Sequence, residues 1–125
     1  MKKIAIYLIL LSSFLFSGSA QNADSLLNVL EGEMDESKQV DVLHQLLLDI
    51  WLNYPDQAMD YGEKALEISR RAGDSTNISK SLRLMAGVHY YKGDYDQSLD
   101  FNLQALEIAL IISDSALINN GYNNI

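Results

Sequence analysis

The 125-residue sequence contains no cysteine, a single proline and only two histidines. Without cysteine the chain forms no disulfide and carries no lipid on a cleavage-site cysteine, so its stability must come from packing. Neither His44 nor His89 has a second histidine or a cysteine at the spacing of a metal site. We therefore expect no metal and no other cofactor.

Catalytic motifs are also missing. The sequence has no zinc-protease histidine pair, no nucleophile elbow and no kinase signature. Gly87 and Gly93 lack the surrounding loop that would cradle a phosphate. The many carboxylates follow the polar faces of the predicted helices, as solvated residues do. We therefore expect that the chain is not an enzyme.

Positive charge is scarce: nine Lys and Arg face seventeen Asp and Glu, for a net charge of −8. Two of the nine, Lys2 and Lys3, stand before an apolar run from Ile4 to Phe16, and small residues follow up to Ala20. This order is typical of a secretory signal peptide, here residues 1–20. The alternative is an uncleaved anchor, but the run is shorter than the roughly 20 residues that span a membrane. Cleavage would leave an acidic chain, for which nucleic acid is not the expected partner.

A motif of the chain returns forty residues later. Asp56–Asp60 reappears as Asp96–Asp100, and the Ala-Leu-Glu-Ile of residues 65–68 reappears at 105–108. Such periodicity indicates stacked supersecondary units, each burying its apolar face against a neighbour. A third unit begins in residues 114–125, so we expect the sequence to be a piece of a longer array.

Apolar spacing and break residues predict the helices. We expect a short capping helix and linker in residues 21–37, with the helix from Asp24 to Gly32 and the linker from Glu33 to Ser37. A helix with one apolar face follows from about Val40 to Trp51, and Pro55 suits the first turn of the next helix. The first repeat is assigned to residues 38–73.

The second repeat is assigned to residues 74–113. Gly73-Asp74-Ser75 supplies a residue that tolerates positive φ and two cap residues. A helix is expected over 76–91, a tight turn at 92–94 and a partner helix over 95–112. On this last helix we expect four leucines to face inward: Leu99, Leu103, Leu106 and Leu110.

Residues 82–106 resemble the tetratricopeptide repeat. The resemblance rests on Leu82, Ala86, the Gly93-Asp94-Tyr95 turn and the small residues Ser98 and Ala105. It implies an all-α solenoid of antiparallel helix pairs, in which the small residues sit where helices approach and Tyr95 fills the corner between them. His89 stands at a position where the family usually has an aromatic ring, so a packed ring is expected.

The first repeat matches the family less well. Ala58, Ala65 and Leu66 are in place, but Pro55 stands where the turn tyrosine belongs and Leu46 where a small residue is expected. A degenerate terminal repeat is usual in such arrays. A short array also lacks a polar end cap, so we expect exposed apolar side chains on 105–112 and 117–122, and a marginal or self-associating protein.

The arrangement as a whole is similar to the exported N-terminal region of bacterial sensor proteins. There a repeat array precedes a transmembrane helix and a histidine kinase or helix-turn-helix output domain. This resemblance implies a non-enzymatic, protein- or peptide-binding part of a two-component signalling protein on the periplasmic side of a Gram-negative-type cell, with membrane contact only through the signal segment or a downstream helix. Two alternatives stay open: the regulatory part of a sensor histidine kinase, and a free-standing periplasmic assembly factor.

The family's groove positions provide the candidate binding residues. In the second repeat they are Lys80, Arg83, Gly87, Tyr90 and Tyr91, and in the started third repeat Asn120 and Asn123. Cations, aromatic rings and amides on one wall suit an extended peptide and its carboxylate. The alternative is that both tyrosines only pack on the preceding repeat and both cations are solvated. The matching wall of the first repeat runs through Val40, Leu43, Leu47, Ile50 and Trp51. It is too apolar for a wet groove, and we expect the helix from Asp24 to Leu30 to cover it.

Overall fold

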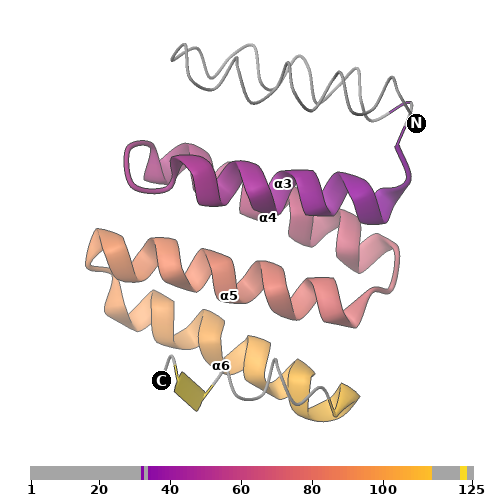
Figure 1. Cartoon of the computed structure of the whole chain (residues 1–125). Coiled ribbons are helices and arrows are strands. Elements are labelled where there is room, and N and C mark those ends of the chain that lie inside the picture. Colours follow the sequence, from indigo (N-terminus) through magenta and orange to yellow (C-terminus); the bar gives the residue numbers. More distant parts are fainter. Residues whose placement is uncertain (1–31, 33, 114–121, 124–125) are drawn as a thin grey trace. The chain divides into compact units, whose positions relative to one another are not determined.

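The computed structural model describes residues 32, 34–113 and 122–123. The chain divides into two compact units, residues 1–35 and 36–125. In the second unit the described residues form four long helices and no strand: α3 (Glu36–Ile50), α4 (Pro55–Arg71), α5 (Ser75–Lys92) and α6 (Tyr95–Ile112) (Figure 1). The expected signal peptide, the capping helix from Asp24 and most of the started third repeat lie outside the described residues.

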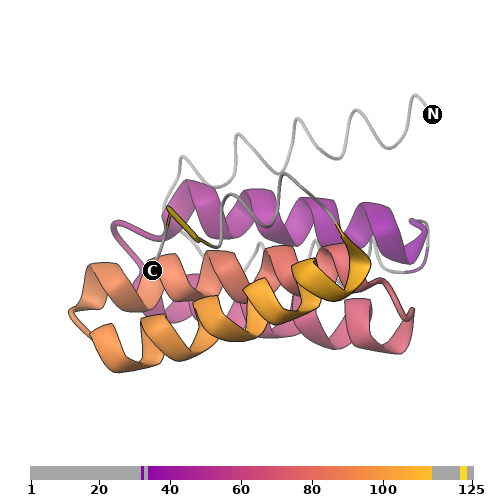
Figure 2. The same ribbon diagram turned by 90° about the horizontal axis from the view of Figure 1, so that it is seen from below.

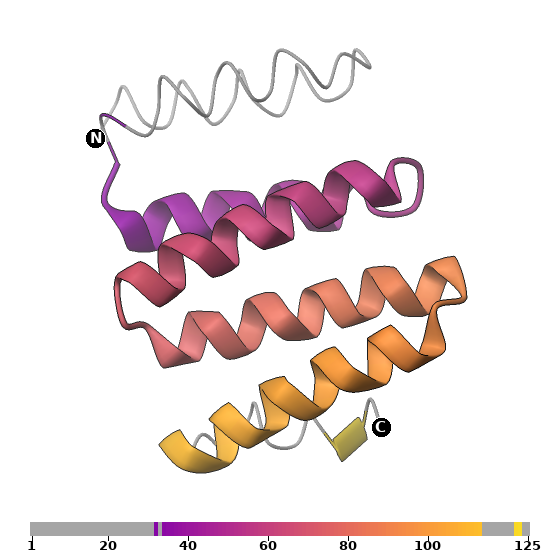
Figure 3. The ribbon, with the colours of Figure 1, turned by 180° about the vertical axis from the view of Figure 1, so that it is seen from behind.

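The four helices form two antiparallel hairpins, α3 with α4 and α5 with α6 (Figure 3). Each helix packs against the next along the chain, and α3 also contacts α5. In the view from below, α5 and α6 lie side by side (Figure 2). Alternate helices therefore share a face, which places α3 and α5 next to each other. The expected all-α architecture of antiparallel helix pairs is confirmed.

The helix ends agree closely with those predicted from the sequence, except at the start of α3. Helix α6 has the expected bounds, and α5 extends one residue beyond each predicted end. Helix α3 begins at Glu36, inside the predicted linker. A carboxylate in the first turn is favoured by the helix dipole, and Glu36 Oε1 also lies 2.8 Å from Arg71 Nη2 of α4. This tertiary contact explains why the helix starts early.

Two Gly-Asp pairs end α4 and α5 with the same backbone geometry. Gly73 has φ +66° and Gly93 has φ +84°, a region that residues with a side chain rarely adopt. In both cases the aspartate N–H reaches back to a carbonyl in the last turn, Asp74 to Ser69 and Asp94 to His89, each at 2.9 Å. This pattern is the Schellman motif, so one dipeptide ends both helices by one mechanism.

The helix starts also follow local chemistry. Pro55 occupies the first turn of α4, where its missing N–H costs no helical hydrogen bond. Asp74 caps α5, since its Oδ1 accepts the Asn77 N–H at 3.0 Å. Both roles were predicted from the sequence.

Small residues lie where the helices approach most closely. Ala58, Ala65, Ala86 and Ala105 are buried, as expected. Gly62 of α4 is equally constrained, because a Cβ added there would lie 2.5 Å from Met85 Cγ of α5. The larger buried side chains of this core include Leu66, Leu82 and Met85, with Met59, Ile78, Phe101 and Ile108 packed around them.

Two buried serines join α5 to α6. Ser98 Oγ donates to the Ala86 carbonyl oxygen at 2.8 Å, and Ser79 Oγ donates to the Ala105 carbonyl oxygen at 2.8 Å. Each bond satisfies a hydroxyl that would be costly to bury alone. The small side chain and its hydrogen bond together fix the spacing of the hairpin.

Two expectations about α6 are wrong. Of the four leucines only Leu106 is buried, whereas Leu99, Leu103 and Leu110 are more than two-fifths exposed. The stripe that faces α5 is instead Ser98, Asn102, Ala105 and Ala109, one residue earlier and hence about 100° around the helix. The α6 helix thus carries two adjacent stripes, and the smaller side chains take the close contact.

Tyr95 does not fill the corner between α5 and α6 as the resemblance implied. Its side chain is 62% exposed, and its ring lies edge-on to Tyr90 with centroids 5.3 Å apart. The corner is closed by Ser98 and Ala86 instead. Ile111 is also exposed, so the expected apolar surface near the end of α6 is present. No helix in the described part of the chain is long and apolar enough to span a membrane.

Candidate functional site

A cavity of about 550 Å³ lies where α3, α5 and α6 face one another. Its lining residues are Leu47, Leu48, Trp51, Arg83, Leu84, Gly87, Tyr90, Ser98, Asn102 and Asn123. Four of the predicted groove residues are among them: Arg83, Gly87, Tyr90 and Asn123. Lys80 and Tyr91 are not, and Asn120 lies outside the described residues. A cavity of this volume is within the range of sites that bind small ligands or single side chains.

The wall contributed by α3 is apolar. Leu47 is fully buried, while Leu48 is about half exposed and the Trp51 ring is partly exposed. Leu84 of α5 adds to the same apolar lining. Of the five residues expected on the first-repeat wall, Leu47 and Trp51 line the cavity, whereas Val40, Leu43 and Ile50 are buried in the core. Leu48 and Leu84 were missed because neither occupies a family groove position.

Arg83 contributes a buried donor to this apolar surface. Its Nε is inaccessible to solvent and has no hydrogen-bond partner among the described residues. A buried N–H without an acceptor costs about 1–3 kcal/mol, more when the group is charged. Arg83 therefore holds a guanidinium beside the cavity with part of its hydrogen-bonding capacity unused.

Gly87 lines the cavity without a side chain. It lies in the interior of α5, where glycine is unfavourable by roughly 0.5–1 kcal/mol relative to alanine. It has no positive φ, and a Cβ built on it would meet no heavy atom of the described residues within 4 Å. Neither backbone conformation nor packing thus requires glycine here, in contrast to Gly62.

The two tyrosines of α5 have different surroundings. The Tyr91 ring packs on Trp51 of the preceding hairpin, with centroids 5.6 Å apart and an interplanar angle of 57°. Tyr90 lines the cavity and is 66% exposed, with Tyr95 against its edge. Lys80 is exposed on the same helix. Tyr91 and Lys80 therefore match the alternative of packing and solvation, whereas Tyr90 and Arg83 border the cavity.

A buried histidine joins α3 to α5 near this wall. His44 Nε2 lies 2.7 Å from Ser81 Oγ, and both side chains are buried. The pKa of His44 is lowered to about 4, mainly by burial; Asp41 opposes this shift, and the nearby cations Lys80 and Arg83 contribute to it. His44 is therefore neutral at physiological pH and acts as a structural hydrogen-bonding group. No sequence pattern indicated this contact, because the two residues come from different repeats.

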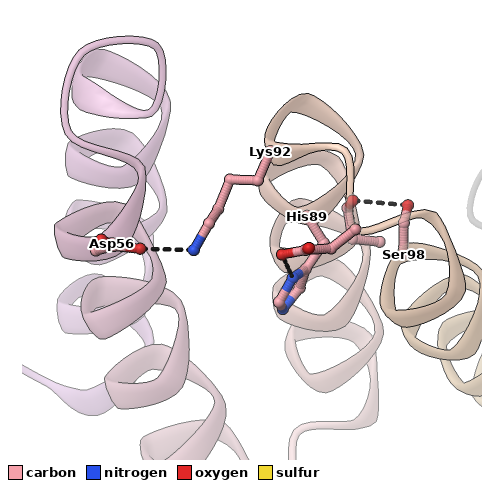
Figure 4. Close-up of polar contacts among 6 residues, drawn as sticks. Asp56, His89, Lys92 and Ser98 are labelled. Atoms are coloured by element: carbon pink, nitrogen blue, oxygen red, sulfur yellow. Dashed lines mark hydrogen bonds and ion pairs between the residues drawn. The ribbon is translucent and has the colours of Figure 1, made fainter.

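Polar contacts hold the turn end of α5 (Figure 4). Lys92 Nζ lies 2.6 Å from Asp56 Oδ1 of α4, and this hydrogen bond raises the pKa of Lys92 above its usual value. His89 Nδ1 lies 3.4 Å from Asp94 Oδ2. The His89 ring also stacks on Phe101, with centroids 5.4 Å apart, which confirms that it is a packed ring.

The described residues contain no group of three or more His, Asp or Glu side chains arranged to hold a metal ion. The cavity instead offers one guanidinium, two amides, a hydroxyl and a phenol on a largely apolar surface. Groups of these kinds can hold and orient a ligand by hydrogen bonds and apolar contact.

The family model for the tetratricopeptide repeat matches residues 53–110, which extend from the turn before α4 to the last turn of α6. No curated protein and no solved structure matches the chain. Tetratricopeptide repeats typically act as non-catalytic scaffolds for protein interaction, which supports a protein or peptide as the partner. The match over this part of the chain and the stacked antiparallel hairpins agree with an all-α helical-repeat fold similar to that of tetratricopeptide repeats.

Proposed function

We propose that the face shared by α3 and α5 binds an extended segment of a partner protein. The observation that carries this proposal is the cavity of about 550 Å³ lined by both helices and by α6. Its apolar side chains suit the anchoring residue of a peptide, and the exposed Tyr90 ring extends the surface beyond the cavity. The protein-interaction role typical of the matched family supports the same function.

Gly87 supplies the test of this proposal. Peptides from a random displayed library are selected on the full chain and then measured on Gly87→Leu, which fills the cavity from α5. The matched control is Glu67→Leu, which introduces the same side chain at an exposed position of α4. We expect the selected peptides to lose binding to Gly87→Leu and to retain it with the control. Equal binding to both variants would refute the proposed site.

We further propose that this surface is the sensory part of a longer, exported signalling protein. The support is the signal-peptide pattern of residues 1–20 and the resemblance of the whole arrangement to bacterial sensor proteins. Expression in a Gram-negative host and N-terminal sequencing of the product test export, with Gln21 as the expected first residue of the mature protein. An intact Met1 on the folded product would count against it.

Two other proposals differ in the kind of segment that comes after the repeats. In the regulatory part of a sensor histidine kinase, a transmembrane segment and an ATP-binding domain would lie beyond Ile125. In a free-standing periplasmic assembly factor, further repeats would lie there without a membrane segment. Sequencing the coding region beyond Ile125 distinguishes them.

A further inference from the structure

We infer that the segment bound in the cavity presents a carboxylate side chain next to a bulky apolar side chain. This inference rests on the proposed function, because it specifies the chemistry of the peptide that the α3–α5 face binds. The carboxylate would accept hydrogen bonds from Arg83, and the apolar side chain would contact Leu47, Leu48, Trp51 and Leu84.

The first argument is the unsatisfied donor. Arg83 Nε is buried and has no partner among the described residues, and the residue Arg83 lines a cavity with room for a ligand. An N–H of a charged group gains most from an ionised acceptor, and a carboxylate fits the planar guanidinium with two parallel bonds. None of the described lining residues is acidic, so none of them supplies this acceptor.

The second argument is the distribution of charge. The chain has seventeen Asp and Glu, yet α5 has none among its eighteen residues, and it carries Lys80, Arg83 and Lys92. Helices α3, α4 and α6 each contain several carboxylates. Of these three cations only Arg83 is among the described lining residues, whereas Lys80 is exposed outside the lining and Lys92 pairs with Asp56. A local positive field favours an anionic group on the ligand even where the net charge is negative.

The third argument is the apolar part of the lining. Leu48 is 47% exposed and Trp51 is partly exposed beside the cavity, so apolar surface faces solvent where it would be covered by a ligand. Covering this surface is favourable by roughly 25 cal/mol for each Å² removed from water. A carboxylate alone would leave it exposed, and an apolar residue alone would leave Arg83 unsatisfied.

The carboxylate belongs to a side chain, because the cavity has no device for a chain terminus among the described residues. C-terminal carboxylates are typically captured by backbone N–H groups that form a nest. Here Leu47, Leu48, Arg83, Leu84 and Gly87 all lie inside helices, where the backbone N–H groups are used by the helix. We therefore assign the carboxylate to a side chain within an extended peptide.

Trp51 provides the measurement, since it is the only tryptophan of the chain and lines the cavity. The probe is a short, N-acetylated, C-terminally amidated peptide with adjacent Leu and Glu in a Ser-Ala host, titrated into the full chain. It is compared with two control peptides: the same peptide with Gln in place of Glu, and this Gln peptide with a free C-terminus. We expect the Glu peptide to bind about ten- to a hundredfold more tightly than either, as a charge-assisted hydrogen bond implies.

Variants of the protein assign the effect to Arg83. In Arg83→Gln we expect the preference for Glu over Gln to disappear, and in Arg83→Lys to be reduced, because lysine keeps the charge without the planar fork. Lys80→Gln is the matched control, since it removes an exposed cation of the same helix that does not line the cavity. It should keep the preference. Circular dichroism of each variant verifies that the helices are retained.

Several results would overturn the inference. These are equal binding of the Glu and Gln peptides, a preference that persists in Arg83→Gln, and tight binding of the free C-terminal peptide alone. If library-selected peptides bind and are lost in Gly87→Leu but contain no acidic residue, the inference fails while the proposed function stands. If no peptide binds at the cavity, both fail.

Discussion

Replacing the two helix-interior glycines by alanine should have opposite effects on stability. Both Gly62 and Gly87 lie within helices and neither has a positive φ, so alanine is compatible with both backbones. In each case the helix itself gains roughly 0.5–1 kcal/mol from the substitution. The difference between the two positions is in what the new methyl group meets.

At Gly87 the methyl group enters open space, because no heavy atom of the described residues lies within 4 Å of the built Cβ. Gly87→Ala should therefore raise the free energy of unfolding by about 0.5–1 kcal/mol. At Gly62 the Cβ would lie 2.5 Å from Met85 Cγ and 3.2 Å from Leu47 Cδ1. Met85 is buried, and its Cγ is close to the backbone and not at the flexible end of the side chain. Overpacking should therefore cost about 1–3 kcal/mol, which outweighs the gain in helix stability. The net expectation for Gly62→Ala is a loss of roughly 0–2 kcal/mol.

Urea denaturation monitored by far-UV circular dichroism measures both changes. A shift of 1 kcal/mol corresponds to about 4–8 °C in Tm for a domain of this size, so thermal melts give an independent check. The reasoning would be refuted if Gly87→Ala lowered stability, or if Gly62→Ala were as stable as Gly87→Ala. A more stable Gly87→Ala with weakened peptide binding would show that the glycine is retained for the cavity and not for the fold.

Three further outcomes are expected. Because burial lowers the pKa of His44 to about 4, the imidazole is protonated at a higher pH in the unfolded chain than in the folded one. The free energy of unfolding should therefore fall by on the order of 3 kcal/mol as pH drops from 6.5 to 4. Urea titrations of His44→Gln should lack this part of the pH dependence. Ser98→Ala removes the hydrogen bond to the Ala86 carbonyl and should lower the free energy of unfolding by about 0.5–1.5 kcal/mol, measured by denaturation; an unchanged value would show that the bond contributes nothing. The exposed Leu103 and Ile111 of α6 should cause concentration-dependent self-association, and sedimentation velocity should show more monomer after Leu103→Lys with Ile111→Lys; an unaltered wild-type monomer at all concentrations contradicts this.

The helices and their ends could be predicted from the sequence because their signals are local. Pro55, Gly73, Asp74 and Gly93 each act on the backbone within one turn, and the structure gives each the expected role. The small residues Ala86 and Ser98 could be predicted as well, since the family pattern places them at close helix contacts. The start of α3 was predicted late because Glu36 is held by Arg71, a residue of another helix.

The orientation of α6 could not be read from spacing alone. Its stripe of leucines and its stripe of small residues lie one position apart, and both have helical periodicity. The crossing with α5 decides between them, and close approach requires Ser98, Ala105 and Ala109 at the contact. The spacing of apolar residues does not show how closely two helices approach. A prediction based on it therefore favoured the leucines.

The candidate site could be predicted only in part. Arg83, Gly87, Tyr90 and Asn123 line the cavity, as the family positions indicated. Tyr91 does not, because its ring packs on Trp51, and Lys80 does not, since it lies about two helical turns before Gly87 on α5. The unpartnered Nε of Arg83 and the contact of His44 with Ser81 depend on atoms from different repeats, for which a single sequence has no signal.

The two serine hydrogen bonds between α5 and α6 have a consequence for local opening. They lie near opposite ends of the hairpin, Ser98 with Ala86 toward the turn and Ser79 with Ala105 away from it. Neither helix can separate from the other at one end without breaking a buried bond there. Amide protons of α5 and α6 should therefore exchange with solvent through one shared opening event, at nearly equal rates in the two helices.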